Sequence, residues 1–414
     1  MAECARKRKR DKILEVSEEF DPIFRSFLAK QDKKDELEQA LIAVKRGIWA
    51  LNLASLHIDD CNARSNTYFS SATLSTTPIK WENDGSQAKG VAFGETFQVG
   101  VDVLENFLSE SPKIPADKQK RTALQKLIKF LIENDHQSLF EKQNSEANWC
   151  VTVAQHLLSE LAVNSTYTVS AHPNPRRCPC GQEDVLVGIV GDTSFGCRKG
   201  WHGQTDIIME EGLPISVIQN SSYGEQLDDL TVNEFDDSAS EDISFSSFEN
   251  KARPDFREKD TMKIMAETIV FSFLQQKLNK GILKNTLIPG IGISGQSLLL
   301  IFYDSVNDVL ISSKPKQLFH QNTINCLSVL ALWLTLNYRL FCTGVTERMK
   351  KYKADFFRRV DGRLGEYTDE VERPLLLQPN TQDDLFPWSP AARAYETSET
   401  DVNYLLLEPD SPKS

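Results

Sequence analysis

The strongest constraint on the fold is the order in which helical and strand-like apolar patterns follow one another in the middle of the chain. Apolar residues recur every three or four positions in the helical stretches, and they form short runs bounded by turn residues in the strand-like ones. Only the four residues "EEGL" separate the second strand-like run from the third, which predicts a hairpin. The pattern as a whole predicts an α/β core. In chain order it predicts a helix at 147–163, strands at 185–190, 205–209 and 214–219, a helix at 262–281, and strands at 286–294, 297–304 and 308–313.

The sequence on either side of this core has a different pattern. Upstream, leucine, valine and isoleucine recur at helical spacing over 37–51 and again over 124–139, which predicts a mainly helical N-terminal region. Downstream, a run rich in lysine and arginine predicts a basic helix, and the residues after it show no periodicity. The 414 residues therefore divide into a basic tail at 1–16, a mainly helical region at 17–146, the core at 147–345 with a disordered acidic insertion at about 222–256, a basic helix at 346–364, and a disordered acidic tail at 365–414.

The formal net charge of −12 conceals an uneven distribution. Residues 224–250 hold nine acidic residues and no lysine or arginine, and residues 365–414 hold eleven acidic against three basic residues. These two segments account for a charge of −17, so the other residues carry about +5. A mildly basic body favours contact with phosphate groups such as those of DNA or RNA. The acidic segments are expected to be disordered, either as solvated chain or as binding segments for basic protein partners.

Several classes of protein are disfavoured by what the sequence lacks. The most apolar helical stretch, residues 326–341, is too short for a membrane span and carries Asn337 and Arg339. No secretory signal pattern follows the basic start, and the eight cysteines are scattered, as is typical of a reducing compartment. The run "RKRKRDK" at 6–12 is typical of a nuclear address or of a solvated tail, so we expect the nucleus or otherwise the cytoplasm. Motifs of nucleotide-binding proteins, zinc proteases and serine hydrolases are absent.

The order helix, three strands, helix, strand resembles the core of the PD-(D/E)XK nuclease-like superfamily. The resemblance covers about 150 residues and implies a central mixed sheet flanked by helices, with carboxylates that hold Mg²⁺ or Mn²⁺ for phosphodiester hydrolysis. Asp206 in "HGQTDIIM" matches the acid at the head of a central strand, and Glu160 in "LLSELAV" matches the acid on the preceding helix. Both residues are therefore predicted metal ligands. On the next strand Gln219 stands where the superfamily has its catalytic lysine, and Val217 stands where it has a further acid.

That departure on the strand "ISVIQN" has consequences for the predicted site. Valine cannot bind a metal ion, so the second acid and the cation would have to come from elsewhere in the chain. The helix after the strand offers acidic and polar candidates, and three lysines could supply a displaced cation. The candidates are Glu267 and Gln275 for the polar groups, and Lys199, Lys263 and Lys277 for the cation.

Asp206 also has an ordinary structural interpretation, because aspartate side chains often accept hydrogen bonds from nearby backbone N–H groups where a loop enters a strand. Two functions follow from the two interpretations. The first is a nucleic-acid-associated protein with metal-dependent phosphodiester hydrolysis, whose catalytic residues would be Asp206, Glu160 and Gln219. The alternative is a non-catalytic interaction protein that uses its acidic segments to bind partners.

A second group of residues predicts a different metal. His172, Cys178, Cys180 and Cys197 have side chains that bind structural zinc. The spacing is unusual, because "CPC" has one residue between its cysteines where zinc motifs generally have two to four. The alternative is a set of free thiols near a proline-rich turn.

Overall fold

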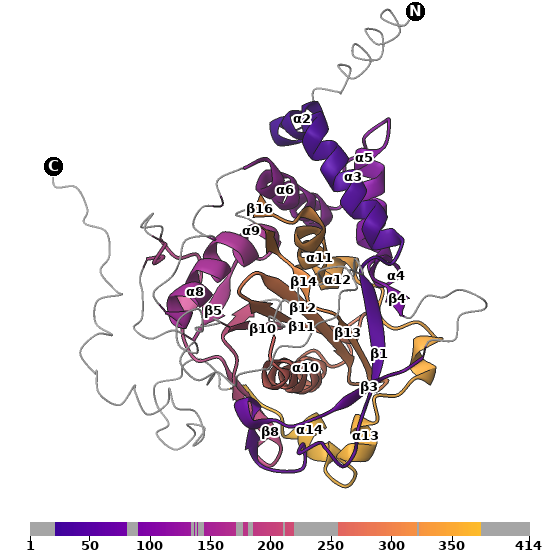
Figure 1. The fold of residues 1–414 in the computed structure, drawn as a ribbon, viewed down its shortest axis with the longest axis vertical. Helices are drawn as coiled ribbons and strands as arrows, with labels where there is room; N and C mark the ends of the chain where they lie inside the picture. Colours follow the sequence, from indigo (N-terminus) through magenta and orange to yellow (C-terminus); the bar gives the residue numbers. More distant parts are fainter. Residues whose placement is uncertain are drawn as a thin grey trace, which may run out of the picture.

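The computed structural model describes residues 21–80, 90–133, 136, 139, 145–170, 177–180, 185–209, 212–218, 256–320 and 323–373. Its largest feature is a mixed sheet of 11 strands in the order β3-β1-β13-β12-β11-β10-β9-β5-β6, with β4 paired to β1 and β14 paired to β12 (Figure 1). These strands are β1 (Ala50–Leu56), β3 (Thr76–Pro78), β4 (Val91–Ala92), β5 (Tyr167–Val169), β6 (Ile189–Val190), β9 (Ile207–Met209), β10 (Leu213–Ile218), β11 (Leu287–Ser294), β12 (Ser297–Asp304), β13 (Val309–Ser313) and β14 (Lys316–Gln317).

Two smaller sheets accompany the main one. β2 (Thr67–Tyr68), β8 (Trp201–Gln204) and β7 (Ser194–Gly196) form a three-stranded sheet in that order. β15 (Phe319–His320) and β16 (Thr323–Ile324) form a hairpin.

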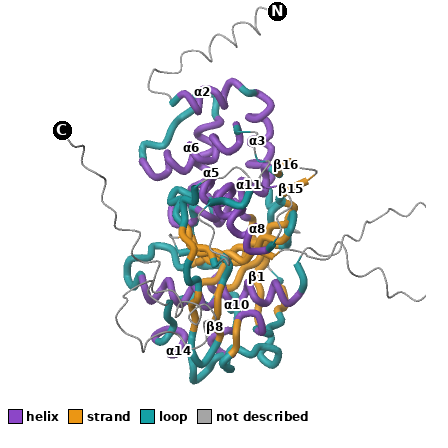
Figure 2. The backbone as a smooth tube through the Cα atoms, turned by 90° about the vertical axis from the view of Figure 1, so that its left-hand side faces the viewer, coloured by secondary structure: helices purple, strands orange, loops and turns teal. Residues whose placement is uncertain are grey.

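Helices cover both faces of the main sheet, and Figure 2 shows α10 and α14 on one side of it and α5, α6 and α11 on the other. Because both faces are covered, every residue of β11 and β12 is buried, which explains their continuous apolar sequences. The helices are α2 (Pro22–Ala29), α3 (Gln31–Lys45), α4 (Phe93–Thr96), α5 (Gln98–Leu108), α6 (Lys118–Ile132), α8 (Glu146–Val153), α9 (Ser159–Leu161), α10 (Glu258–Leu278), α11 (Cys326–Leu336), α12 (Tyr338–Phe341), α13 (Phe356–Arg359) and α14 (Leu364–Asp369). Short 3₁₀ turns lie at Phe69–Ser71 and Met349–Lys351, and a π-helical turn at Ala154–Leu158 joins α8 to α9.

The predicted α/β core, with a mixed sheet flanked by helices, is confirmed. β9 and β10 form the expected antiparallel hairpin, in which Met209 pairs with Leu213. β10 then runs parallel to β11, and the buried helix α10 makes the crossover between them. This arrangement places the head of β9 and one face of α10 next to each other, where the candidate site lies.

The strand predicted at 185–190 is mostly not formed. Only Ile189 and Val190 of the first run are in a strand, the edge strand β6. Between β6 and β9 the chain leaves the main sheet and forms β7 and β8 of the three-stranded sheet. Glycines 196 and 203 both have positive φ there, which bends the backbone away from regular strand geometry.

The described residues of the N-terminal region include the helices α2 to α6, but this region is not separate from the core. β1 lies inside the main sheet, where Leu53 pairs with Ile311 of β13. The helical pattern predicted over 37–51 also ends early. α3 stops at Lys45, and Gly47 takes a φ of +72°, a conformation typical of the residue that follows a helix.

The C-terminal prediction needs two corrections. A single basic helix at 346–364 does not form, because the short turn at Met349–Lys351 and the helix α13 are separated by Asp355, which has a φ of +63°. Residues 364–373, of which 365–373 were expected to be disordered, belong to the fold. Tyr367 is buried there, and its hydroxyl donates a hydrogen bond to the Ala63 carbonyl.

Other expected segments lie outside the described residues. These are the basic run at 6–12, most of the acidic insertion at about 222–256, and the chain after 373. No helix among the described residues is long and apolar enough to cross a membrane.

Candidate functional site

Asp206 lies immediately before β9 and faces both the next strand and helix α10. Its Oδ2 atom accepts a hydrogen bond from the backbone N–H of Val217, at 2.9 Å. The same oxygen lies 3.4 Å from Nζ of Lys263, in the second turn of α10. The Asp206 carboxylate therefore links β9 to β10 by the hydrogen bond from the Val217 N–H, and to α10 by the ion pair with Lys263.

Glu267 follows Lys263 by one helical turn, and its side chain is 2% exposed. Its Oε2 atom accepts hydrogen bonds from the hydroxyls of Ser216 on β10 and Thr205 at the entry to β9. Its Oε1 atom accepts no hydrogen bond from the described residues and lies 3.8 Å from Nζ of Lys263. Burial, together with the charge of Asp206, raises the pKa of Glu267 to about 7, although Lys263 and the hydroxyls act in the opposite direction.

Lys263 is the cation that holds these two acids together. Burial acts to lower its pKa, but the charges of Asp206 and Glu267 outweigh burial and raise the pKa above its ordinary value. Glu146, in the first turn of α8, is close enough to this cluster to interact electrostatically with Asp206 and Lys263. Burial and then the charge of Asp206 raise the pKa of Glu146. We call Asp206, Lys263 and Glu267 the acid–lysine cluster.

The predicted partner of Asp206 on the preceding helix lies in a different environment. Glu160 in α9 is 42% exposed, and its carboxylate pairs with Lys129 of α6 at 3.7 Å. Glu160 and Asp206 thus each have their own lysine partner, from different helices. Gln219 lies outside the described residues. Val217 contributes its backbone N–H to Asp206, while its side chain is buried in the core.

Of the residues that the sequence offered as a replacement acid, polar group or cation, only two lie at this site. Lys263 and Glu267 face the site, whereas Lys199 pairs with Glu366 and Glu370 of the α14 region. Lys277 donates to the carbonyl of Val371, and Gln275 accepts from Arg339.

Ser216 and Thr205 were not predicted as site residues. The signal for Ser216 was present, because it is the polar residue in the apolar strand "LPISVI", and a buried hydroxyl needs a partner.

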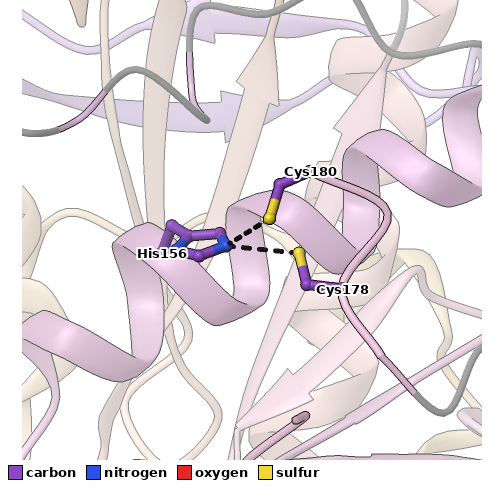
Figure 3. A group of neighbouring side chains, drawn as sticks. All are labelled: His156, Cys178 and Cys180. Carbon is purple, nitrogen blue, oxygen red and sulfur yellow. Dashed lines mark hydrogen bonds between the residues drawn. The ribbon is translucent and has the colours of Figure 1, made fainter. Parts of the chain in front are cut away.

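A second cluster gathers around His156, in the middle of the π-helical turn between α8 and α9. Its Nε2 atom lies 3.2 Å from Sγ of Cys178 and 3.2 Å from Sγ of Cys180 (Figure 3). Among the described residues, these three form the one group of three or more histidine, cysteine or acidic side chains whose ligand atoms lie close enough to share a metal ion. We call His156, Cys178 and Cys180 the thiol–imidazole cluster.

The predicted zinc set is therefore only partly assembled. Cys178 and Cys180 do lie together, and both are buried. Cys197 precedes β8, where its backbone N–H donates to the Trp201 carbonyl, and His172 lies outside the described residues. The sequence did not indicate a role for His156, because a regular helix was predicted at 147–163 where the structure has a π-helical turn.

Comparisons with protein families, with curated proteins and with solved structures give no match to this chain.

Proposed function

We propose that this chain is a nucleic-acid-associated protein whose core hydrolyses phosphodiester bonds of DNA or RNA with the help of Mg²⁺ or Mn²⁺. The observation that carries the proposal is the approach of Lys263 and Glu267, on α10, to Asp206 at the head of β9. Two carboxylates and a lysine are the charge set that the nuclease-like resemblance requires. Here the second acid and the lysine come from the helix after β10, and β10 itself carries Ser216 and Val217.

The acidic groups suit a hard cation. Glu267 Oε1 is a buried carboxylate oxygen to which no described residue donates, and such an atom is a ready ligand for Mg²⁺ or Mn²⁺. Val217 and Lys263 both approach Oδ2 of Asp206, so Oδ1 is the oxygen that an ion would take. A bound ion would polarise the phosphate and lower the pKa of a bound water.

The other groups of the cluster would act on charge and position. Lys263 stays protonated at neutral pH because its pKa is raised, so it would meet a phosphate oxygen and offset the charge that develops there. Ser216 and Thr205 hold Oε2 of Glu267, which fixes the direction of the carboxylate.

The test is a cleavage assay with the full chain on double-stranded DNA, single-stranded DNA and RNA, in Mg²⁺, Mn²⁺ or EDTA. We expect metal-dependent cleavage that falls at least about 100-fold in Asp206→Asn and in Lys263→Met, the size of effect seen when one charge-stabilising group is removed. Matched controls are Glu105→Gln and Lys45→Met, which break an exposed ion pair between α3 and α5 and should retain activity. Wild-type protein that does not cleave, or Asp206→Asn that cleaves equally well, would overturn the proposal.

Glu160→Gln belongs in the same assay, because the sequence resemblance assigns Glu160 to the metal and the contacts with Lys129 do not support that role. If the metal is held by Asp206 and Glu267, Glu160→Gln should cleave like the controls, and Glu267→Gln should not. The reverse pattern would return the second ligand to Glu160.

One contact favours the second candidate, a non-catalytic interaction protein. Oδ2 of Asp206 already accepts the Val217 N–H and the Lys263 ammonium, so the carboxylate has a complete structural role without any ligand. On this interpretation the protein gains no stability from Mn²⁺, and Asp206→Ala loses stability equally with and without the ion. Thermal melts of both proteins with and without Mn²⁺ separate this candidate from the first.

A further inference from the structure

The thiol–imidazole cluster is assembled from two segments that lie more than 20 residues apart in the chain. His156 comes from the helix, and the two cysteines come from the turn that contains Pro179. Figure 3 shows the imidazole pointing toward both sulfur atoms, which flank it from the facing turn. The cysteine side chains are almost fully buried, and the histidine is half-buried. Three soft or borderline donor atoms therefore converge at one point beneath the surface.

A local irregularity of the helix produces this convergence. Residues Ala154–Leu158 form a π-helical turn, which inserts an extra residue into the helix and turns the following side chains relative to a regular helix. His156 stands at the centre of the turn. Its neighbour Gln155, in the same turn, makes hydrogen bonds with the chain at Val185 and Val187, after the cysteines. Such single π-helical turns occur frequently at functional sites.

We propose that His156, Cys178 and Cys180 bind a zinc ion. Zinc with Zn–S bonds of about 2.3 Å and a Zn–N bond of about 2.0 Å, in tetrahedral geometry, separates nitrogen from sulfur by about 3.5 Å. The observed separations of 3.2 Å are close to that value, so small side-chain movements would admit the ion. Thiolate and imidazole ligands select zinc over magnesium or calcium. A fourth position remains for water or a further ligand.

The packing of the neighbouring segment explains what the ion would do. The chain from 185 to 190 is weakly packed, since Val185, Val187 and Ile189 are 73%, 50% and 51% exposed. Gln155 holds it by hydrogen bonds with the Val185 carbonyl and the Val187 N–H. With so little apolar burial, a metal ion is an effective means of fixing the segment to α8 and α9. Bound there, the ion would hold the cysteine turn against the π-helical turn and so help to anchor the edge strand β6.

The test measures zinc in the purified full chain and the absorption spectrum after replacement of zinc by Co²⁺. We expect about one equivalent of zinc per chain and the visible and near-ultraviolet bands of tetrahedral cobalt with thiolate ligands. Cys178→Ser, Cys180→Ser and His156→Ala should lower the zinc content to about a tenth of an equivalent or less. His156→Cys keeps three ligands and should retain the metal with a shifted cobalt spectrum, which guards against loss through misfolding.

Two further cysteine variants make the test specific. Cys150→Ser removes a buried thiol from α8, the helix that leads to His156, and should leave the zinc content unchanged. Cys197→Ser should do the same, and loss of zinc in this variant would instead support the set predicted from sequence and overturn the role of His156. The proposal also fails if wild-type protein holds no zinc and gives no cobalt spectrum, or if its intact mass shows a Cys178–Cys180 disulfide.

Discussion

The acid–lysine cluster on α10 and the thiol–imidazole cluster at the π-helical turn are supported in opposite ways. Asp206 and Glu267 sit between buried strands and a buried helix, and the chain itself supplies their partners in Lys263, Ser216 and backbone N–H groups. Cys178 and Cys180 sit on a turn beside a segment with little apolar packing. A densely packed region can hold charged groups in place without a ligand, whereas a sparsely packed region depends on one.

The difference extends to charge. The acid–lysine cluster contains opposite charges that partly cancel, so its geometry persists in the absence of a metal ion. The thiol–imidazole cluster contains no lysine, arginine or carboxylate among its three members. A divalent cation bound there would be neutralised by the cysteines themselves after they release their protons. Removing metal should thus affect the two clusters very differently.

The largest expected effect comes from zinc removal. A strong chelator should lower the free energy of unfolding of the wild type by about 4 kcal/mol when free zinc previously exceeded its dissociation constant a thousandfold. Chemical denaturation should show no such loss in Cys180→Ser, which has already lost the ion. Hydrogen exchange should locate the change in residues 185–190, while β11 and β12 stay protected. If zinc removal increases hydrogen exchange equally in residues 185–190 and in β11 and β12, the ion does not support only the segment near the thiol–imidazole cluster.

The next effect is the pH dependence that Glu267 imposes. Its folded pKa of about 7 exceeds the ordinary value of 4.5, so between these values the folded state holds a proton that the unfolded state has lost. Stability therefore falls as pH rises through this window, by about 3 kcal/mol in total, and the loss is complete above pH 7. Glu267→Gln should flatten this part of the stability profile measured by denaturation, and Glu105→Gln should not. If the stability profiles of wild type and Glu267→Gln run parallel between pH 4.5 and 7, the pKa of Glu267 is not raised in the folded state.

A smaller effect is expected from Asp206→Ala without metal. The substitution leaves the Val217 N–H without its acceptor and removes a charge partner from Lys263, which should cost about 1–3 kcal/mol. Glu160→Ala breaks the half-exposed pair with Lys129 and should cost about 1 kcal/mol or less. Urea denaturation of the two variants measures the difference. If Asp206→Ala is as stable as the wild type, repulsion among the acids outweighs the structural role of Asp206.

The sequence predicted the parts of the fold that depend on neighbours in the chain. The β9–β10 hairpin follows from two apolar runs joined by a short turn, and α10 follows from its length and apolar composition. It did not predict β1, because the partner of Leu53 is Ile311, and no local pattern records a pairing over such a distance. The short strands β7 and β8 were not predicted either. Glycines with positive φ bend the chain there into a separate sheet, and the sequence pattern does not show this bend.

The candidate sites were predictable to a similar degree. Asp206 stood out as the acid at the head of an apolar run, and the helical spacing of Lys263 and Glu267 already allowed both to face one site. His156 was not predicted because the helix expected at 147–163 assumes a regular period of 3.6 residues. The π-helical turn changes that period, and nothing in the residue types announces the change.

The pairing of β1 with β13 has a consequence for how the protein is made. A ribosome that adds about 5–20 residues per second needs tens of seconds to synthesise the roughly 260 residues between Leu53 and Ile311. During this time β1 emerges long before its central partner, although β3 and β4 follow it closely. An open strand edge on a nascent chain invites pairing with other chains. The yield of folded protein in a cell should therefore depend on translation speed and on chaperones that shield this edge.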